Sequence, residues 1–599
     1  MLGPVEIPVE EYSRRKRQRD AAASARERTH IYLGNAKVGI FIAVVIYTAF
    51  ALTNNPSAIV YSIALVAFVS LSIWHEFVMS ALTRARAAVQ HYEDGLARIE
   101  DRWMRDEPSG ERFRDRDHPY ADDLDIFGPR SLFQLLSCCR TPMGEQRLAT
   151  WLLHVVTVEE IQQRQSRVAA LKDRVGLRER IAVVNAGRRQ SINAAKLIVW
   201  AETRRQMPAI RPLVVSMALA FTIAFAVYMN GGRGIYVIIV AAINVALLAY
   251  LGKRGHDVVE NLAASTESAA LGLLSNVIRE MEREPFDATR FVTGLKGDTA
   301  SRGIARLARI SDWADSRHNA FLRLSEIPFL FTLQLAYAAE SWRAEYGRHL
   351  HEWIDAVAET EALLSLAGYA YEHPEDPFPD LIHGAPLVDA VDATHPLIPA
   401  VTAVRNSFKL GGSSPKAPAP SPRILIVSGS NMSGKSTLMR TVGINAVLAF
   451  AGAPVRAARL RLTPLQIGTC LRHTDSLQER RSGFYTEALR LRAIADLLDG
   501  PRPVLFLFDE LLSGTNSKDR RTASEGVIRT MLSKNAIGMV TTHDLALTEI
   551  AELSKGDVKN VHLQDTVVDG KMVFDYKLRA GVITHSNALE LMRIIGLDV

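Results

Sequence analysis

The chain has 599 residues, too many for one hydrophobic core, and this length predicts roughly three or four structural units. The net charge of +6 permits an anionic partner, either nucleic acid or an acidic membrane surface, without choosing between them. The 3 cysteines, Cys138, Cys139 and Cys470, lack the spacing of a metal site or disulfide framework, so we expect reduced thiols in a cytosolic environment.

Four uncharged apolar stretches form two pairs, each divided by a short turn-forming segment, and predict two membrane hairpins. The expected helices are Val38–Leu52 with Ser57–Trp74, and Pro212–Met229 with Ile235–Leu251. A span needs about 20 apolar residues, so the first helix is short unless Lys37 snorkels and lets it begin earlier. The alternative is a pair of fully buried helical hairpins in a soluble protein.

Basic residues flank the same end of both hairpins, whereas the two tips hold only Arg233. The flanking residues are Arg14–Arg28, Arg84, Arg86, Arg204, Arg205, Arg211, Lys253 and Arg254. The positive-inside rule therefore predicts a multi-pass protein of the inner cell membrane with both termini in the cytoplasm. The cluster Arg14–Arg19 suits lipid headgroups or a phosphodiester backbone, and it also serves as a topogenic flank. No charged side chain lies within the four stretches, which weakens a channel or pump interpretation.

The segments on either side of the second hairpin are predicted to be helical. Residues 124–210 form the first helical segment and residues 255–380 the second, with amphipathic patterns such as Leu322–Ala338. Residues 387–412 read as short strands, and a strand-and-helix region begins at residue 423.

A phosphate-binding motif follows the strand-like run Arg423–Val427 and matches G-x-x-x-x-G-K-[ST] in full. Its glycines let backbone N–H groups face phosphate oxygens, and the helix that starts near Gly434 adds its positive end. We expect Lys435 to reach the β- and γ-phosphates of ATP and Ser436 to ligate Mg²⁺. The expected nucleotide-binding residues are Gly429, Ser430, Asn431, Met432, Ser433, Gly434, Lys435, Ser436 and Thr437.

Two further strand-like runs end in candidate catalytic residues. Val504–Phe508 ends in Asp509 and Glu510, an acidic pair typical of a Walker B motif. Asp509 is expected to hold Mg²⁺, and Glu510 to orient or deprotonate the attacking water. The run Ala536–Val540 leads to His543, which can sense the γ-phosphate or the water from the same sheet edge.

A weaker signal lies between these motifs, where Ser482 and Gly483 precede a helix and can present a hydroxyl, amides and a helix N-terminus to a phosphate. By itself this is an ordinary N-cap pattern.

Taken together, the motifs resemble the MutS mismatch-repair family. The matching segments of the carboxy-terminal region are Gly429–Thr437, Ser482–Glu487, Asp509–Glu510, Ser513–Asn516, Asp519, Thr541–His543, Phe574–Leu578, Gly581, Ser586–Ala588 and Gly596–Leu597. Leu124–Leu132 and Arg140–Gly144 resemble the start of that family's helical core, and His395–Leu397 and Asn406 its strands beside the nucleotide. The resemblance implies a homodimer of the ABC ATPase kind, in which Ser482 caps the γ-phosphate held by the partner.

The sequence also departs from that family. Its mismatch reader carries a Phe-x-Glu wedge in an amino-terminal domain, and the only Phe-x-Glu here is Phe508–Glu510. Membrane helices occupy the space ahead of residue 124, and the chain ends with the ATPase, so we expect neither a mismatch-recognition domain nor a carboxy-terminal nuclease.

The expected fold is multidomain, with transmembrane α-helical hairpins, an α-helical MutS-like core or lever, and a C-terminal α/β P-loop ATPase of the ABC type. The expected units are a basic cytoplasmic arm (1–30), hairpin 1 (31–80), a charged segment with the first part of the core (81–210), hairpin 2 (211–252), the second part of the core (253–385) and the ATPase (386–599).

Three functions fit this organisation. The favoured one is a membrane-anchored ATPase that hydrolyses ATP as a dimer and moves helical arms that engage DNA. The alternative is a membrane ATPase that acts on a protein or membrane partner without DNA. An ABC transporter fits worst, because Leu-Ser-Gly-Gly-Gln is expected ahead of Walker B, where this chain has Arg481–Phe484.

Overall fold

The computed structural model describes most of the chain. The described residues are 6–51, 57–104, 108–184, 193–265, 267–284, 299–316, 324–412, 421–430, 432–472, 483–512, 515–543, 545–554, 556–568 and 571–582.

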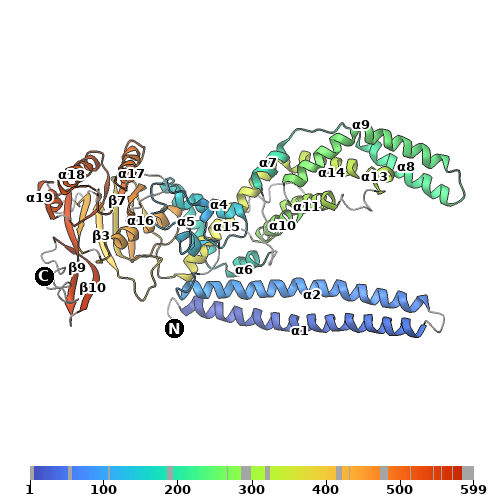
Figure 1. Ribbon diagram of the computed structural model, residues 1–599, viewed down its shortest axis with the longest axis horizontal. Coiled ribbons are helices and arrows are strands. Elements are labelled where there is room, and N and C mark those ends of the chain that lie inside the picture. Colours follow the sequence, from blue (N-terminus) through green and yellow to red (C-terminus); the bar gives the residue numbers. More distant parts are fainter. Residues whose placement is uncertain are drawn as a thin grey trace.

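Two long antiparallel helices, α1 (Glu6–Ala51) and α2 (Ala58–Ile99), form the first hairpin (Figure 1). The basic amino-terminal residues belong to the same helix as the first apolar stretch, so the boundary expected at residue 30 lies inside α1. An Ala-rich sequence and the ion pairs from Glu11 to Arg14 and Arg15, one turn away, favour this continuity.

The second hairpin consists of α8 (Arg211–Met229) and α9 (Ile235–Ser265). Both hairpins extend from the helical part in the same direction, away from the β-sheets (Figure 1). All four helices are long and apolar enough to cross a membrane, and their apolar stretches are at most 17% buried within the chain. The four expected apolar helices are therefore present.

The other helices ahead of the sheets lie between the hairpins and the sheets or beside hairpin 2. They are η1 (Glu111–Phe113), α3 (Leu132–Leu136), α4 (Pro142–Leu153), α5 (Val158–Leu171), α6 (Val175–Val183), α7 (Ala194–Glu202), α10 (Ser268–Glu282), α11 (Ala300–Ser316), α13 (Glu326–Phe329), α14 (Phe331–Tyr346), η3 (Gly347–His349) and α15 (Leu350–Glu372). Of these, α11, α13 and α14 lie beside hairpin 2. The long helix α15 is buried over most of its length and runs through the centre of this region.

Hairpin 1 is joined to α15 by a buried ion pair. The guanidinium of Arg98 donates to both carboxylate oxygens of Glu372, over 2.7 Å from Nε and 2.6 Å from Nη2. These side chains are only 13% and 1% exposed. Tyr12 of α1 donates its hydroxyl to the same carboxylate at 3.3 Å, and Gly95 leaves room for the Tyr12 ring. Both helices of the hairpin therefore meet the end of α15.

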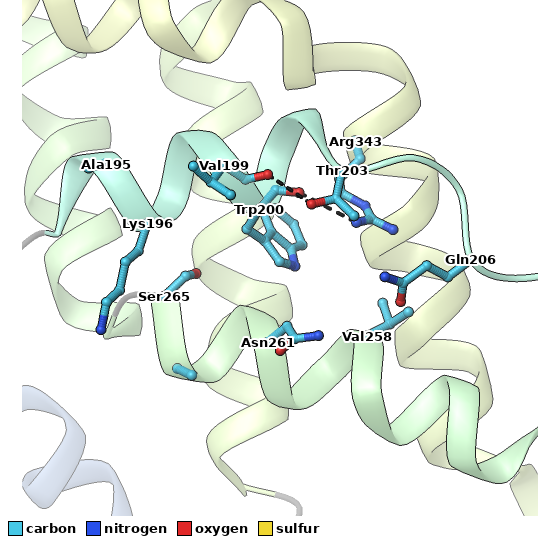
Figure 2. Close-up of a pocket in the computed structure, with 11 residues that line it drawn as sticks. Ala195, Lys196, Val199, Trp200, Thr203, Gln206, Val258, Asn261, Ser265 and Arg343 are labelled. Atoms are coloured by element: carbon cyan, nitrogen blue, oxygen red, sulfur yellow. Dashed lines mark hydrogen bonds between the residues drawn. The ribbon is translucent and has the colours of Figure 1, made fainter.

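Hairpin 2 is joined to the helical part where α7, α9 and α14 meet (Figure 2). The Arg343 guanidinium lies 5.4 Å from the centre of the Trp200 ring and donates to the Trp200 carbonyl at 3.4 Å and to Glu340 at 2.5 Å. A mostly apolar cavity of about 510 Å³ lies beside this contact and is lined also by Val258 and Asn261 of α9. The carboxy-terminal part of α9 thus packs on α14, which leads through η3 into α15.

A buried carboxyl group ties α15 to the start of α4. Glu361 accepts hydrogen bonds from the Thr141 hydroxyl at 2.6 Å and from the Thr141 and Arg140 amides at 3.1 and 3.3 Å. Burial raises the pKa of Glu361 to about 7, and these hydrogen bonds only partly oppose that rise. The folded state therefore holds a proton that the unfolded chain releases near pH 4.5.

This shift makes stability depend on pH. Because the folded pKa is the higher one, the free energy of unfolding should fall as pH rises from about 4.5 to about 7. Glu361→Gln, which is neutral at every pH, should reduce that decline and raise the apparent Tm at pH 8 relative to the wild type. Thermal unfolding at pH 5 and pH 8 measures both. Glu352→Gln, an exposed control on the same helix, should keep the decline, and an unchanged decline in Glu361→Gln would contradict the assignment.

The carboxy-terminal region contains two sheets. The smaller has the order β1-β5-β2-β3, with β1 (Asp380–Leu381), β2 (Leu387–Ala393), β3 (Asn406–Gly411) and β5 (Arg459–Leu462). The larger has the order β10-β9-β4-β8-β7-β6, with β4 (Ile424–Ser428), β6 (Gln466–Cys470), β7 (Val504–Phe508), β8 (Ile537–Thr542), β9 (Val558–Val568) and β10 (Lys571–Ala580). Only β10 runs antiparallel to its neighbour in the larger sheet. The helices of this region are α16 (Lys435–Ala451), α17 (Gly483–Leu497), α18 (Ser517–Ser533), η4 (Leu545–Glu549) and α19 (Ile550–Leu553).

The larger sheet shares one hydrophobic core with the first helical segment, across the boundary expected at residue 386. Leu124 lies against Gly443 of α16, and the buried Asp123 accepts hydrogen bonds from the Thr469 hydroxyl at 2.8 Å and the Leu471 amide at 2.9 Å. Helices α4 and α5 thus pack on α16, which lies against the larger sheet.

Candidate nucleotide site

The loop that the sequence predicts to bind phosphate, residues 429–436, follows β4, which is buried along its whole length. Gly429 and Gly434 have φ angles of +154° and +91°, which side chains rarely adopt. A Cβ at Gly434 would lie 2.9 Å from the Tyr576 ring, and one at Gly429 would lie 2.6 Å from the Ser433 hydroxyl. The two glycines therefore allow the loop to close tightly before α16 begins at Lys435, with the positive end of the helix at the loop.

The Lys435 side chain lies inside this loop and is 3% exposed. Its Nζ donates to the carbonyls of Gly429 and Ser430 at 2.9 and 2.8 Å. Burial lowers the pKa of Lys435, while the nearby carboxylates of Glu510 and Asp509 oppose this shift. A buried ammonium held by neutral carbonyls, with the His543 imidazole and two carboxylates nearby, suits phosphate oxygens, since these add negative charge where burial disfavours the cation.

Three hydroxyl and carboxyl groups from different elements meet beside the loop. Ser436 of α16 donates to one oxygen of Asp509, which follows β7, and Thr541 of β8 donates to the other. The Glu510 amide donates to the Thr541 hydroxyl at 3.0 Å. Ser436 and Asp509 thus lie together, as the sequence predicts, and their hard oxygen atoms fit Mg²⁺.

Glu510 and His543 face each other at the same sheet edge. The Nε2 atom of His543 lies 2.7 Å from Glu510 Oε1 and 3.1 Å from Lys435 Nζ. With its proton on Nε2 the imidazole donates to Glu510, and without it the same nitrogen accepts from Lys435. Glu510 itself has a left-handed backbone, with φ of 48°, immediately after β7. The edge therefore brings an imidazole within hydrogen-bond distance of both a carboxylate and an ammonium.

A cavity of about 370 Å³ opens beside the loop. It is lined by His395, Ile398, Thr402, Ala403, Val404, Asn406, Met432, Gly434, Lys435, Ser436, Thr437, Leu438, Thr441 and Tyr576. The side chain of Asn406 holds the backbone of β10 in place, since it donates to the Tyr576 carbonyl at 3.0 Å and accepts from the Leu578 amide at 2.8 Å. Tyr576 is 43% exposed beside the loop.

The sequence places Phe574–Leu578 in a matching segment without assigning a role to Tyr576. In the sequence, Tyr576 is only an aromatic residue between two charged ones. Nothing in this local pattern indicates that it lines a cavity beside a loop far upstream in the sequence. A second residue without an assigned role, Glu487, is buried on α17 and accepts from the Leu512 amide at 2.6 Å, which fixes the segment after β7.

Of the other expected site residues, some are placed by the structure and some lie outside the described residues. Ser433 donates its hydroxyl to the Ser430 carbonyl at 2.8 Å, and the Met432 side chain is 69% exposed. Asn431 and Ser482 lie outside the described residues, as do Ser513, Gly514 and the matching segments after residue 582.

Comparisons with known proteins agree with this geometry. Residues 425–598 match the family model of MutS domain V. A curated relative, Endonuclease MutS2 of Thermus thermophilus, is 33% identical over 213 residues, which cover 34% of this chain and 26% of that protein. The chain thus matches about a quarter of the relative's length. The carboxy-terminal region, residues 425–598, is therefore similar to MutS domain V, as its motifs predict.

Proposed function

We propose that this protein is a membrane-anchored MutS-family ATPase that binds and hydrolyses ATP with Mg²⁺ as a dimer. The observation that carries the proposal is the convergence of Lys435, Ser436, Asp509, Glu510 and His543 at the carboxyl ends of β4, β7 and β8. In parallel sheets, ligands bind at this edge.

Each of these residues has a distinct task in the proposed reaction. The loop amides and Lys435 bind the phosphate oxygens, and Ser436 and Asp509 hold Mg²⁺, which neutralises charge on the phosphates. Glu510 orients the attacking water and takes its proton as the water oxygen bonds to the γ-phosphorus and ADP leaves. His543 contacts both Lys435 and Glu510, and it is proposed to sense the negative charge of the γ-phosphate beside them.

The cavity lined by Tyr576 is proposed to take the nucleobase, because an exposed ring beside the phosphate-binding loop offers a stacking surface. Base–aromatic stacking contributes about 1–3 kcal/mol. Tyr576→Ala should therefore raise the Kd for ATP by roughly tenfold, whereas Tyr576→Phe should restore binding. Titration with a fluorescent ATP analogue measures both. Equal affinity in Tyr576→Ala and the wild type would place the base elsewhere.

We propose a homodimer that forms through the ATPase region. MutS-family proteins commonly act as dimers, and the family assignment supports the same arrangement here. In this arrangement Ser482 and the amino-terminal end of α17 cap the γ-phosphate held by the partner subunit. The buried Glu487, which links α17 to the segment after β7, would carry the arrival of the partner to Glu510.

The two hairpins are proposed to anchor the protein in the inner membrane, with both termini and the ATPase in the cytoplasm. Their common direction and their basic flanks support this topology. The proposed units keep the ranges 1–30, 31–80, 81–210, 211–252, 253–385 and 386–599, with the first unit continuing into the first span as one helix.

The favoured task is movement of helical arms that engage DNA. The name of the matched relative, an endonuclease, supports a DNA-related activity, and the clustered arginines at 14–19 supply positive charge near the membrane. The alternative is a protein or membrane partner without DNA. The buried ion pair between Arg98 and Glu372 favours it, because it links hairpin 1 directly to the helix that leads into the first sheet.

The ATPase rate of the purified protein, with and without duplex, mismatched and branched DNA across a salt series, distinguishes these tasks. Stimulation that weakens steeply with salt would indicate phosphate contacts and support the DNA-engaging function. Activity that is indifferent to every DNA would reject that function and favour a membrane or protein partner.

A further inference from the structure

The sequence has a helix-like amphipathic pattern at Leu322–Ala338 that contains Pro328, and the structure has a break within it. The short helix α13 ends at Phe329, Leu330 adopts a left-handed conformation with φ of 51°, and α14 starts at Phe331. The chain therefore turns at Leu330 next to hairpin 2, and α13 packs against both α8 and α9.

This turn lies beside the apolar run of α9. Asn244 is fully buried within the run, and its side-chain amide donates to the Ile327 carbonyl at 2.8 Å and reaches the Pro328 carbonyl at 3.5 Å. Further along, Leu333 packs against Gly255, where a Cβ would lie 2.8 Å from the leucine side chain. Asn244 precedes the basic residue Lys253 by nine positions, about 13 Å along a helix. The turn is therefore level with the inside of the apolar stretch.

The surface of the turn is apolar and faces away from the protein. Leu324, Ile327 and Phe329 are 76%, 44% and 45% exposed. Exposed apolar side chains of the neighbouring α9 run, such as Ile243 and Val245, extend the same kind of surface. Such a surface is unfavourable in water and favourable among lipid chains.

Several backbone polar groups at the turn are hydrogen bonded to side chains, as a medium without water requires. The side-chain amide of Asn244 donates to the Ile327 carbonyl, and that of Gln334 donates to the Phe329 carbonyl at 2.7 Å. The Glu326 carboxylate accepts from the Thr332 amide at 3.2 Å and hydroxyl at 2.9 Å, so the start of α14 is capped as well. Non-helical backbone at membrane depth is tolerated only where its polar groups are bonded within the protein.

A tryptophan marks the neighbouring helix end. Trp313, near the end of α11, is 53% exposed, and its ring meets Phe331 edge-on at 5.9 Å between centres. Tryptophan is enriched at the boundary between lipid headgroups and acyl chains. Its position next to the first residue of α14 is consistent with a bilayer surface at this level of the molecule.

From these contacts we propose that residues 324–331 form a re-entrant segment that enters the bilayer beside α8 and α9 and returns to the same side, with Leu324, Ile327 and Phe329 against lipid acyl chains. The proposal rests on membrane insertion of hairpin 2. Asn244 is the positioning residue that holds the segment at that depth.

The test uses the full-length protein in phosphatidylcholine–phosphatidylglycerol vesicles, in a background where Cys138, Cys139 and Cys470 are replaced by Ser and ATPase activity is retained. Single cysteines at Phe329, at Ile239 of α9 and at Val401, which is 94% exposed, carry a nitroxide spin label. Relaxation by oxygen, which concentrates in lipid, and by a water-soluble nickel chelate gives the depth of each label.

The Phe329 label should behave like the Ile239 label, with several-fold higher oxygen than nickel accessibility, and unlike the Val401 label. Nickel accessibility equal to that at Val401 would overturn the proposal, and so would protection from both reagents, since protein would then cover the surface. A lipid-exposed Ile239 label with a water-exposed Phe329 label rejects only the re-entrant segment, whereas a water-exposed Ile239 label rejects hairpin insertion itself. Asn244→Leu should make the Phe329 label several-fold more accessible to nickel, and Asn230→Leu at the hairpin tip should not.

Discussion

Replacing Glu510 with Gln is expected to reduce kcat for ATP hydrolysis by about 10²–10⁴-fold, the usual contribution of a general base. The amide cannot accept a proton from water, but it has nearly the shape of the carboxylate and can still hydrogen bond to His543. Lys435, Ser436 and the loop that binds the phosphates are unchanged, so ATP should bind as tightly as to the wild type. Steady-state hydrolysis and equilibrium ATP binding separate these two effects.

The same variant should accumulate in the ATP-bound dimer, because closure no longer leads to hydrolysis. Size-exclusion chromatography with ATP and Mg²⁺ should shift Glu510→Gln to the larger species, and removal of Mg²⁺ should reverse the shift. Glu552→Gln, an exposed carboxylate in the same region, provides the matched control and should hydrolyse ATP normally. Normal turnover in Glu510→Gln would assign the proton acceptor to another group.

Glu372→Gln is expected to destabilise the contact between hairpin 1 and α15 by about 3–5 kcal/mol, because it leaves the Arg98 guanidinium buried without a counter-charge. The amide also removes one of the two oxygen acceptors that Arg98 uses. The result should be a lower apparent Tm and faster proteolysis of the segment after α2. Both measurements are made on the detergent-solubilised protein.

A surface ion pair in the same hairpin supplies the control. Arg86 of α2 contacts Glu27 of α1 at 2.6 Å, and the two side chains are 58% and 48% exposed. Glu27→Gln should cost at most about 1 kcal/mol, as exposed pairs do. Equal effects of Glu27→Gln and Glu372→Gln would show that the buried pair does not hold the hairpin to α15.

The parts of this molecule that were predictable are those encoded locally. The four apolar helices follow from uncharged runs, and the meeting of Ser436 with Asp509 follows from strand runs that end in characteristic residues. The continuity of α1 is less evident from the sequence, because a basic cluster followed by an alanine-rich run also suits a disordered arm.

The parts that escaped prediction depend on contacts between distant segments. Arg98 and Glu372 are 274 residues apart, and nothing in either local sequence indicates the other. The break at Leu330 follows the helix-breaking residue Pro328, but the contact with Asn244 that supports it comes from another helix and is not evident locally. Tyr576 reaches the cavity because Asn406, on the smaller sheet, holds its backbone.

The most direct test of the central claim is hydrolysis of ATP by the full-length protein in lipid nanodiscs or vesicles, measured against protein concentration with Mg²⁺ and with EDTA. We predict that hydrolysis requires Mg²⁺ and disappears in Glu510→Gln. Where dimers form, the rate should rise more steeply than in proportion to protein concentration. A rate with Mg²⁺ no higher than that of Glu510→Gln, at concentrations where the protein is dimeric and binds ATP, would contradict this claim.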